Sequence, residues 1–282
     1  MATLRRYTGR RVLITGAGSG IGQACALRIL EEGGRVAAAD VSEAGLGDTV
    51  SRAGAAADRL HPVVMDVAAE DSVRSGVRQA VDALTESGAE AEAGPGSEPG
   101  LDTLVNAAGI LRSARLPDTA LADFEQVLRV NLIGTFLVIR EALAALRHGN
   151  APAVVNFSST SANFAHPYMT AYAASKGGIL AMTHALAAEF AREGIRFNSV
   201  QPGSISSGMT DGTGESRQSV GPGLPADADM RLFAKVAPAL RLPDRAIFAT
   251  PDAVAAVVAM LGSPEAFFVT GTEVRIDGGA HM

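Results

Sequence analysis

The sequence has a single cysteine, Cys25, among its 282 residues. One thiol cannot form an intramolecular disulfide or a thiolate metal cluster. The five histidines are scattered along the chain without the spacing of zinc ligands, so we predict no metal site. These histidines are His61, His148, His166, His184 and His281.

Basic residues are outnumbered by acidic ones. Lys and Arg number 24 against 30 Asp and Glu, which gives a net charge of −6. A chain with this balance lacks the general electrostatic attraction to nucleic acid or anionic lipid that a basic protein has. We therefore expect a small-molecule partner, and neither nucleic acid nor a membrane.

Long hydrophobic runs are missing as well. The N-terminal MATLRRYTGRR is followed by an apolar run, residues 12–14, that is too short for the hydrophobic region of a signal peptide. The longest strongly apolar uncharged stretch, residues 177–188, falls short of the roughly 18 residues of a spanning helix. We therefore expect a cytoplasmic protein.

Short runs rich in β-branched residues alternate with longer alanine-rich segments of helical period. This alternation is typical of a parallel, doubly wound α/β sheet with helices on both faces. The predicted strands are residues 11–15, 35–40, 62–65, 101–106, 153–158, 196–201 and 273–276. The predicted helical segments are residues 20–31, 43–55, 71–85, 121–147, 171–192 and 251–261.

Two stretches interrupt this alternation. Residues 86–100 contain four Glu and no basic residue between Gly and Pro, which predicts a flexible acidic insertion at the surface. Residues 204–250 are rich in Gly, Ser and Pro around a helical patch at 227–239, and they follow the sixth predicted strand. Because loops of this length in a compact domain are usually functional, we predict a substrate-binding loop or lid.

Three glycines, Gly16, Gly20 and Gly22, lie where the first predicted strand is followed by the first helix. Missing Cβ atoms allow close approach to a pyrophosphate, and the helix N-terminus supplies N–H groups and a positive dipole. The spacing differs from the Gly-x-Gly-x-x-Gly fingerprint, and no lysine follows as in a P-loop. The alternative is a glycine-rich turn without a ligand, but the strand–turn–helix context favours a dinucleotide site.

Asp40 ends the second predicted strand, about 20 residues after the glycine loop, where an acidic side chain accepts hydrogen bonds from the adenosine ribose. A carboxylate there would repel a 2′-phosphate, and residues 41–48 contain no Arg or Lys to bind one. The sequence therefore favours NAD over NADP. The alternative is that Asp40 only caps the next turn.

Tyr172 and Lys176 are four residues apart in a predicted helix, so both side chains lie on one face. A phenol has a pKa of about 10, and a nearby ammonium group has the right sign to lower it. Tyr172 would then exchange a proton with a substrate oxygen while hydride moves at the adjoining carbon. On spacing alone, a surface pair is the more common explanation.

The glycine loop and the Tyr–Lys pair belong to a longer series of motifs. In chain order the motifs are Gly16 to Gly22, Asp66-Val67, Asn106-Ala107-Ala108-Gly109, Asn131, Ser158-Ser159, Tyr172-x-x-x-Lys176 and Pro202-Gly203. Their order over nearly the whole chain resembles the short-chain dehydrogenase/reductase family. The resemblance implies a single Rossmann-type domain over residues 1–282, and a homotetramer or dimer joined through the helices around 121–147 and 171–192.

The resemblance also implies four catalytic residues. Ser159 would hydrogen-bond the substrate oxygen, and its neighbour Ser158 is the less favoured serine. Tyr172 would be the acid and base, and Lys176 would hold the nicotinamide ribose and lower the pKa of that tyrosine. Asn131 would support a water-linked proton relay to the lysine. The alternatives are that Asn131 only caps backbone groups and that Ser159 is one of several loop hydroxyls.

The same resemblance implies a cofactor site built from several motifs, in which Ser207 stands where the family often has Thr. The alternatives are that Asn106 caps backbone groups and that Asp66 starts the next helix. The implied cofactor residues, from the pyrophosphate and ribose through the adenine to the nicotinamide, are Gly16, Ser19, Gly20, Ile21, Gly22, Asp40, Asp66, Val67, Asn106, Ala107, Gly109, Tyr172, Lys176, Pro202, Gly203 and Ile205.

Residues 163–168 would border the substrate pocket, with His166 and Tyr168 as candidate substrate contacts. Together these features predict an NAD-dependent oxidoreductase that interconverts a secondary alcohol and a ketone. One alternative is a 3-oxoacyl-carrier-protein reductase that uses NADPH. A more distant alternative is a dinucleotide-binding regulator that has lost catalysis.

Overall fold

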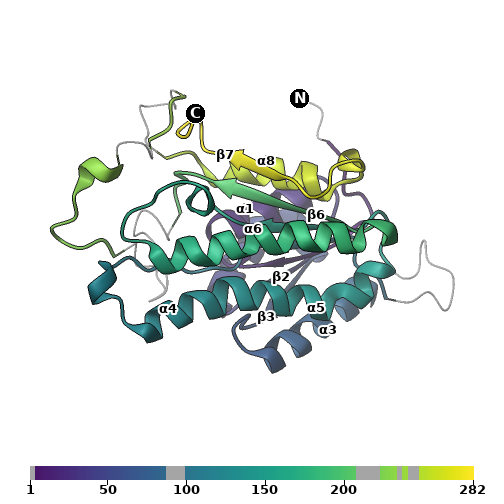
Figure 1. The fold of residues 1–282 in the computed structure, drawn as a ribbon. Helices are drawn as coiled ribbons and strands as arrows, with labels where there is room; N and C mark the ends of the chain where they lie inside the picture. Colours follow the sequence, from purple (N-terminus) through teal and green to yellow (C-terminus); the bar gives the residue numbers. More distant parts are fainter. Residues whose placement is uncertain (1–3, 87–98, 208–222, 234–236, 241–247) are drawn as a thin grey trace.

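The chain folds around one sheet of seven parallel strands in the order β3-β2-β1-β4-β5-β6-β7 (Figure 1). The structure, a computed structural model, describes residues 4–86, 99–207, 223–233, 237–240 and 248–282. The strand order reverses between β1 and β4, as in a doubly wound sheet. The predicted fold class is therefore confirmed. The strands are β1 (Arg11–Thr15), β2 (Arg35–Asp40), β3 (Leu60–Val64), β4 (Thr103–Asn106), β5 (Ala153–Phe157), β6 (Arg196–Pro202) and β7 (Glu273–Ile276).

Helices cover both faces of this sheet (Figure 1). One face carries α3 (Glu70–Glu86), α5 (Gly134–Arg147) and α6 (Thr170–Phe190). The other carries α1 (Gly20–Glu31), α2 (Glu43–Ala53) and α8 (Pro251–Gly262). Among the residues that the structure describes, none of these helices is both long and apolar enough to cross a membrane. Short 3-10 turns are Gly54–Arg59, Leu116–Asp118, Thr160–Ala162, Ala191–Glu193, Met230–Phe233 and Pro264–Ala266.

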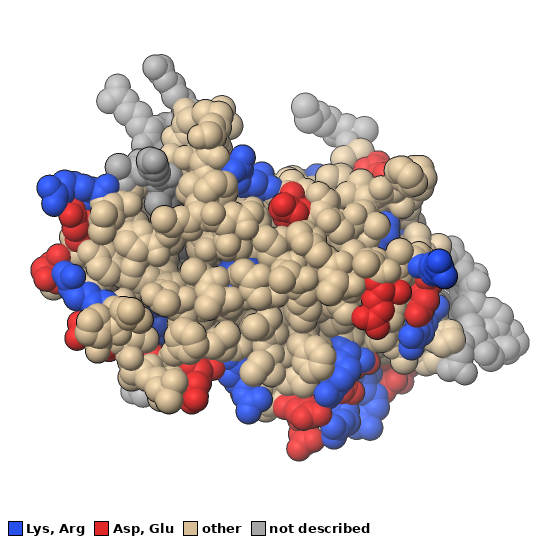
Figure 2. Space-filling view, viewed as in Figure 1, with Lys and Arg blue, Asp and Glu red and all other residues tan. Residues whose placement is uncertain are grey.

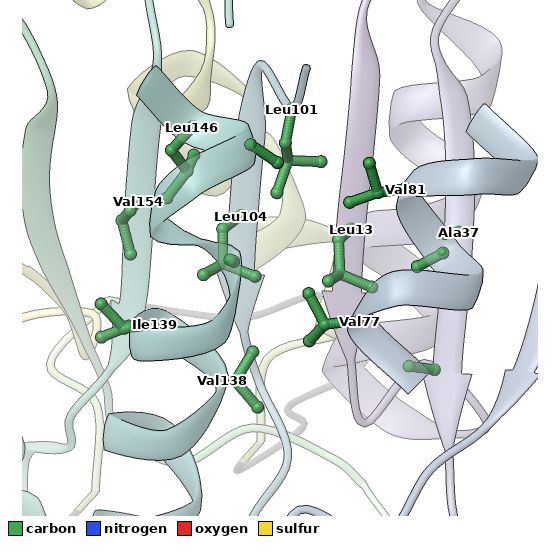
Figure 3. Packing of buried hydrophobic residues seen from close by; sticks show 14 of the residues in the cluster. Leu13, Ala37, Val77, Val81, Leu101, Leu104, Val138, Ile139, Leu146 and Val154 are labelled. Carbon is green, nitrogen blue, oxygen red and sulfur yellow. The ribbon is translucent and has the colours of Figure 1, made fainter. Parts of the chain in front are cut away.

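Alternate residues of each inner strand enter the two cores. In β1, Leu13 packs with the cluster under α3 and α5, whereas Val12 and Ile14 pack with the cluster under α1 and α8. Figure 3 shows Leu104 of β4 between side chains of α5 and of α3. Because both faces of the inner strands are buried, their sequences are continuous apolar runs and do not alternate between apolar and polar residues.

The helical region predicted over 121–147 is interrupted. Helix α4 (Leu121–Leu128) is followed by a π-helical turn, Arg129–Ile133, before α5 begins. A π turn adds a residue to the helical repeat and often occurs at functional sites. Asn131 lies in this turn and is fully buried.

The helix predicted over 227–239 is wrong in extent. Of its described residues, only Met230–Phe233 form a short 3-10 turn, which starts where Asp229 accepts a hydrogen bond from the Arg231 N–H. Proline at 238 cannot donate a helical hydrogen bond, and Ala239 gives its N–H to the Gly278 carbonyl instead. Most of the predicted acidic insertion, residues 87–98, lies outside the described residues.

Asp102 joins the amino ends of three strands. Its carboxylate accepts hydrogen bonds from the Arg11 N–H at 2.7 Å, the Asn150 N–H at 2.7 Å and the Arg11 guanidinium at 3.0 Å. Burial opposes ionisation, but these donors together hold the pKa of Asp102 below its ordinary value. A carboxyl group with a lowered pKa stabilises the fold above about pH 4, and this contribution disappears as pH falls through the folded-state pKa.

We expect Asp102→Asn to reduce the free energy of unfolding by about 2 kcal/mol at neutral pH, because charged hydrogen bonds are lost. The deficit relative to the unmodified protein should shrink below about pH 4, where Asp102 is protonated first in the unfolded chain and then, as pH falls through its lowered pKa, in the folded protein. Urea unfolding at neutral and acidic pH measures both effects. Asp82→Asn, at an exposed position of α3, is the matched control and should leave stability unchanged. A deficit independent of pH would contradict the charge argument.

Candidate active site

The predicted site residues gather at one edge of the sheet. Gly16 follows β1, Asp40 ends β2, Asn106 ends β4, Ser159 follows β5 and Pro202 ends β6. The carboxyl ends of parallel strands meet at the same edge, marked in Figure 1 by the arrowheads of β6 and β7. Ligands of doubly wound sheets bind at this edge, next to the reversal of strand order.

The turn between β1 and α1 has no room for side chains at two glycines. Gly16 has a φ of +70°, and a Cβ on it would lie 2.7 Å from the Ala108 nitrogen. A Cβ on Gly22 would collide with the Gly16 carbonyl. The turn ends at Ser19, whose side chain makes no cap hydrogen bond to the first turn of α1. A tight backbone cradle at a helix N-terminus fits a pyrophosphate group.

Helix α2 supports this turn from behind. The Thr49 hydroxyl donates to the Ala17 carbonyl at 2.8 Å, and the Gln23 side-chain amide donates to Thr49 Oγ1 at 2.9 Å. A Cβ on Gly45 would lie 2.8 Å from the Gly18 carbonyl oxygen, so α2 packs directly on the turn. The sequence analysis missed these supporting residues, because nothing in their spacing distinguishes them from ordinary residues of a buried helix face.

The Asp40 carboxylate lies against the glycine turn. It accepts hydrogen bonds from the Gly18 N–H and the Ser42 N–H, both at 2.9 Å. A Cβ on Gly18 would lie 2.9 Å from the carboxyl carbon of Asp40. Asp40 therefore caps the turn that follows it, and the same hydrogen bonds hold its carboxylate beside the glycine turn.

Asp66 also makes the local contact that the alternative interpretation expected. Its Oδ1 accepts a hydrogen bond from the Ala68 N–H at 2.9 Å in the turn before α3. Val67 is buried, and a Cβ on Gly134 would lie 3.0 Å from its side chain. Contact of Asp66 and Val67 with an adenine ring stays a prediction.

A chain of buried polar side chains joins β4 and β5 to α6. The Asn106 amide donates to Asn156 Oδ1 at 2.9 Å, and the Asn156 amide donates to Thr183 Oγ1 at 3.0 Å. Asn106 Oδ1 is buried without a partner among the described residues. Asn106 is thus a structural link between layers as well as a residue at the predicted cofactor edge.

Asn131 holds the segment after β4 against α6. Its Oδ1 accepts the Ile110 N–H at 2.8 Å, while its amide donates to the Ile110 carbonyl and to Ser175 Oγ, both at 3.0 Å. A Cβ on Gly109 would lie 3.2 Å from Asn131 Oδ1 and 3.6 Å from Lys176 Nζ, so these groups are neighbours. The side chain of Asn131 positions backbone here, and its place in a proton relay stays a prediction.

Lys176 is buried in α6 and points to the end of β5. Its Nζ donates to the Phe157 carbonyl at 2.7 Å and lies 5.5 Å from the centre of the Tyr172 ring. Burial lowers the pKa of Lys176 to about 8, because the charged amine has lost its hydration. The amine is therefore close to half-protonated just above neutral pH.

Of the two serines, Ser159 is the one whose hydroxyl acts on Tyr172. Ser158 instead donates its hydroxyl to the Lys176 carbonyl at 2.9 Å. Burial raises the pKa of Tyr172 to about 12, and the Ser159 hydroxyl offsets this only in part. Desolvation of the phenolate dominates here and the Lys176 amine is directed at the Phe157 carbonyl, so the lowering of this pKa by Lys176 stays a prediction.

The segment after β6 covers the nicotinamide side of the predicted site. The Gly203 N–H donates to the Ile276 carbonyl at 3.0 Å, and a Cβ on Gly203 would lie 2.7 Å from Asp277 Cβ. Ile205 is buried and pairs with Ala249. A Cβ on Gly20 would lie 3.4 Å from the Ser207 side chain, so this segment passes next to the start of α1.

His166 lies in a small aromatic cluster completed by the C-terminal segment. Its Nδ1 is 3.1 Å from the Phe164 carbonyl oxygen, its Nε2 is 3.4 Å from Thr160 Oγ1, and burial lowers its pKa. His281 stacks on Phe164 with ring centres 4.3 Å apart, and its Nδ1 is 3.0 Å from Asp277. Nothing in the sequence distinguishes His281 from the other scattered histidines, because its aromatic partners Phe164 and His166 are more than a hundred positions away.

Comparison with known proteins extends these observations. The family model described as short chain dehydrogenase matches residues 10–218. The chain is similar to a 3-oxoacyl-[acyl-carrier-protein] reductase of Thermotoga maritima, with 34% identity over 97% of this chain and 98% of the relative.

Solved structures share the whole fold. A short chain dehydrogenase from Mycobacterium paratuberculosis bound to NAD has a TM-score of 0.82 and 28% identity over 98% of each chain. A short chain dehydrogenase from Burkholderia cenocepacia J2315 in complex with NADP has a TM-score of 0.79 and 30% identity, covering 98% of this chain and 100% of the other. The chain belongs to the short-chain dehydrogenase/reductase family, whose members are nucleotide-binding oxidoreductases acting on CH–OH groups.

Proposed function

We propose that the protein is an NAD-dependent oxidoreductase that interconverts a secondary alcohol and a ketone. The observation that carries this proposal is the pair of neighbouring hydroxyls, Ser159 and Tyr172, beside the buried amine of Lys176. Two adjacent hydroxyls suit a substrate oxygen that must be both bound and protonated.

The two hydroxyls have different roles at the substrate oxygen. Ser159 binds it, and Tyr172 donates a proton to it in ketone reduction or removes one in alcohol oxidation. A nicotinamide dinucleotide, when bound, would supply the hydride donor or acceptor. A tyrosine with a pKa near 12 is protonated at neutral pH, which suits reduction. Oxidation requires the phenolate, which a positive charge on Lys176 stabilises.

The cradle supports a dinucleotide as the cofactor. The glycine turn has room for backbone contact only, and Asp40 lies beside it with its carboxylate already oriented by the Gly18 N–H. Residues 41–48 provide no Arg or Lys for a 2′-phosphate. Relatives bind either NAD or NADP, so the choice of NAD rests on Asp40.

A 3-oxoacyl thioester reductase is the second candidate. The Thermotoga maritima relative carries that activity in its name, which favours it for a chain that is 34% identical. Such a reductase would bind the keto oxygen of the thioester with the same Ser159 and Tyr172 hydroxyls, and it would use NADPH. The regulator without catalysis is the third candidate, and it is disfavoured because the described site retains both hydroxyls and the buried amine.

Helices α5 and α6 support assembly with further copies of the chain. Figure 2 shows few charged side chains in the middle of the face that these helices form. Four exposed positions of α6 are alanines, and Phe136 of α5 is 46% exposed. We propose that this face joins subunits of a homodimer or homotetramer. The exposed alanines are Ala174, Ala181, Ala185 and Ala188. A cytoplasmic location stays a prediction.

Incubation with NAD and a panel of secondary alcohols, hydroxysteroids and 3-hydroxyacyl thioesters tests the activity through NADH formation. We expect at least one compound to be oxidised, and Tyr172→Phe to lower kcat by about 100-fold to 10,000-fold because the proton acceptor is lost. Tyr7→Phe is the matched control, since it removes a buried hydroxyl that donates to the Ala259 carbonyl away from the site. Unchanged turnover in Tyr172→Phe would rule out the mechanism.

Asp40→Asn tests the cofactor preference. The amide keeps one of the two oxygens that accept the Gly18 and Ser42 N–H groups, and it removes the charge that repels a 2′-phosphate. We expect kcat/KM with NADP relative to NAD to rise at least about tenfold. Asp58→Asn, at an exposed position outside the site, should leave the ratio unchanged. A preference of the unmodified protein for NADP would show that Asp40 does not set the choice.

Lys176→Met tests how the buried amine changes the free energy of unfolding with pH. The folded pKa of about 8 lies below the ordinary value of 10.5, so between these pH values the unfolded chain binds a proton that the folded chain lacks. Relative to Lys176→Met, the unmodified protein should therefore gain up to about 3 kcal/mol of stability as pH rises through this window. Urea unfolding at pH values below and above the window measures it. Parallel stability profiles would contradict the lowered pKa.

A further inference from the structure

Tyr168 has a backbone conformation that large residues rarely adopt. Its φ is +65°, and it lies between Ser159 and the start of α6. Its carbonyl accepts a hydrogen bond from the Ala114 N–H at 2.9 Å. Unfavourable backbone conformations persist where surrounding contacts enforce them, and they often occur at functional sites.

The side chain of Tyr168 contacts two segments that are remote in sequence. Its hydroxyl oxygen accepts the Asp229 N–H at 3.0 Å, and its ring stacks with Phe233 at 6.2 Å between centres. The Arg115 guanidinium lies 5.6 Å from the centre of the same ring and pairs with Asp227 at 2.8 Å. One aromatic ring thus joins the segment after β4 to residues 227–233.

These contacts border a small cavity. Its volume is about 80 Å³, and its lining includes Tyr168, Thr170, Ala171, Arg112 and Asp123. Ala171 directly precedes Tyr172 in α6. In Figure 1, the described part of the 204–250 loop extends away from the sheet at the edge where β6 and β7 end. The position of residues 227–233 therefore bears on access to the site.

We propose that Tyr168 is a positioning residue that holds residues 227–233 beside the substrate pocket and thereby sets the affinity for substrate. This inference rests on the proposed function, because it assigns the pocket next to Tyr172 to the substrate. Phe233 and Arg115 both stack on the ring, and the hydroxyl accepts a backbone N–H. Tyr168 thus acts through the loop, and the role predicted for it as a direct substrate contact stays a prediction.

Trypsin provides a readout that does not depend on activity. The Arg231 side chain is 90% exposed, and cleavage after it requires local opening of residues 227–233. Tyr168→Phe removes only the acceptor of the Asp229 N–H, so we expect cleavage at Arg231, identified by fragment mass, to be about fivefold faster. Tyr168→Asn should have a larger effect, because it also removes the ring while asparagine tolerates a positive φ.

Steady-state kinetics provide the second readout. We expect the KM of the best panel alcohol to rise about fivefold in Tyr168→Phe, with kcat and the affinity for NADH unchanged. Tyr7→Phe, the same chemical change at a distant buried tyrosine, should alter neither KM nor cleavage at Arg231. Thermal unfolding of each variant establishes that the proteins remain folded.

Two results would overturn the proposal. One is unchanged cleavage at Arg231 in both Tyr168 variants. The other is a fall in kcat with KM unchanged, which would mean that Tyr168 acts on the chemical step. If no panel compound is oxidised, the proposed function fails, whereas the cleavage rates still decide whether Tyr168 holds the loop.

Discussion

The junction between the end of β5 and helix α6 determines the geometry of the site. The Lys176 amine donates to the Phe157 carbonyl, and the Ser158 hydroxyl donates to the Lys176 carbonyl. These reciprocal bonds hold one strand end to one helix turn in a single orientation. Tyr172 is one helical turn before Lys176, so the same junction brings its phenol to Ser159.

Burial makes this junction specific, and it also lowers the stability of the folded protein. The Lys176 amine is buried and the Tyr172 phenol is half-buried, so each resists ionisation, and their pKa values move in opposite directions, that of Tyr172 to about 12 and that of Lys176 to about 8. Holding these two groups neutral costs the fold stability. Asn131 and Asn106 support the arrangement, because the Asn131 amide joins the segment after β4 to Ser175 of α6 and the Asn106 amide joins β4 to β5.

Much of the fold could be predicted from local patterns. Continuous apolar runs separated by helical segments specify buried parallel strands, because only helix-covered sheets bury both faces. The glycine turn and the Tyr–Lys spacing likewise have local physical meanings. The helix over 227–239 could not be predicted correctly, since its Ala239 N–H bonds to the distant Gly278 carbonyl. The pKa of Tyr172 depended on burial, which no spacing reveals.

The sequence by itself determined the strand and helix order, the glycine cradle and the acidic residue beside it, because these follow from short-range sterics and periodicity. Only the tertiary structure decided that Ser158 bonds the Lys176 carbonyl, that Lys176 binds the end of β5, and that His281 joins His166. It also decided that Tyr168 contacts residues 227–233. Hydrogen bonds, desolvation and ring contacts act between groups brought together by folding, so their partners are absent from any local stretch of sequence.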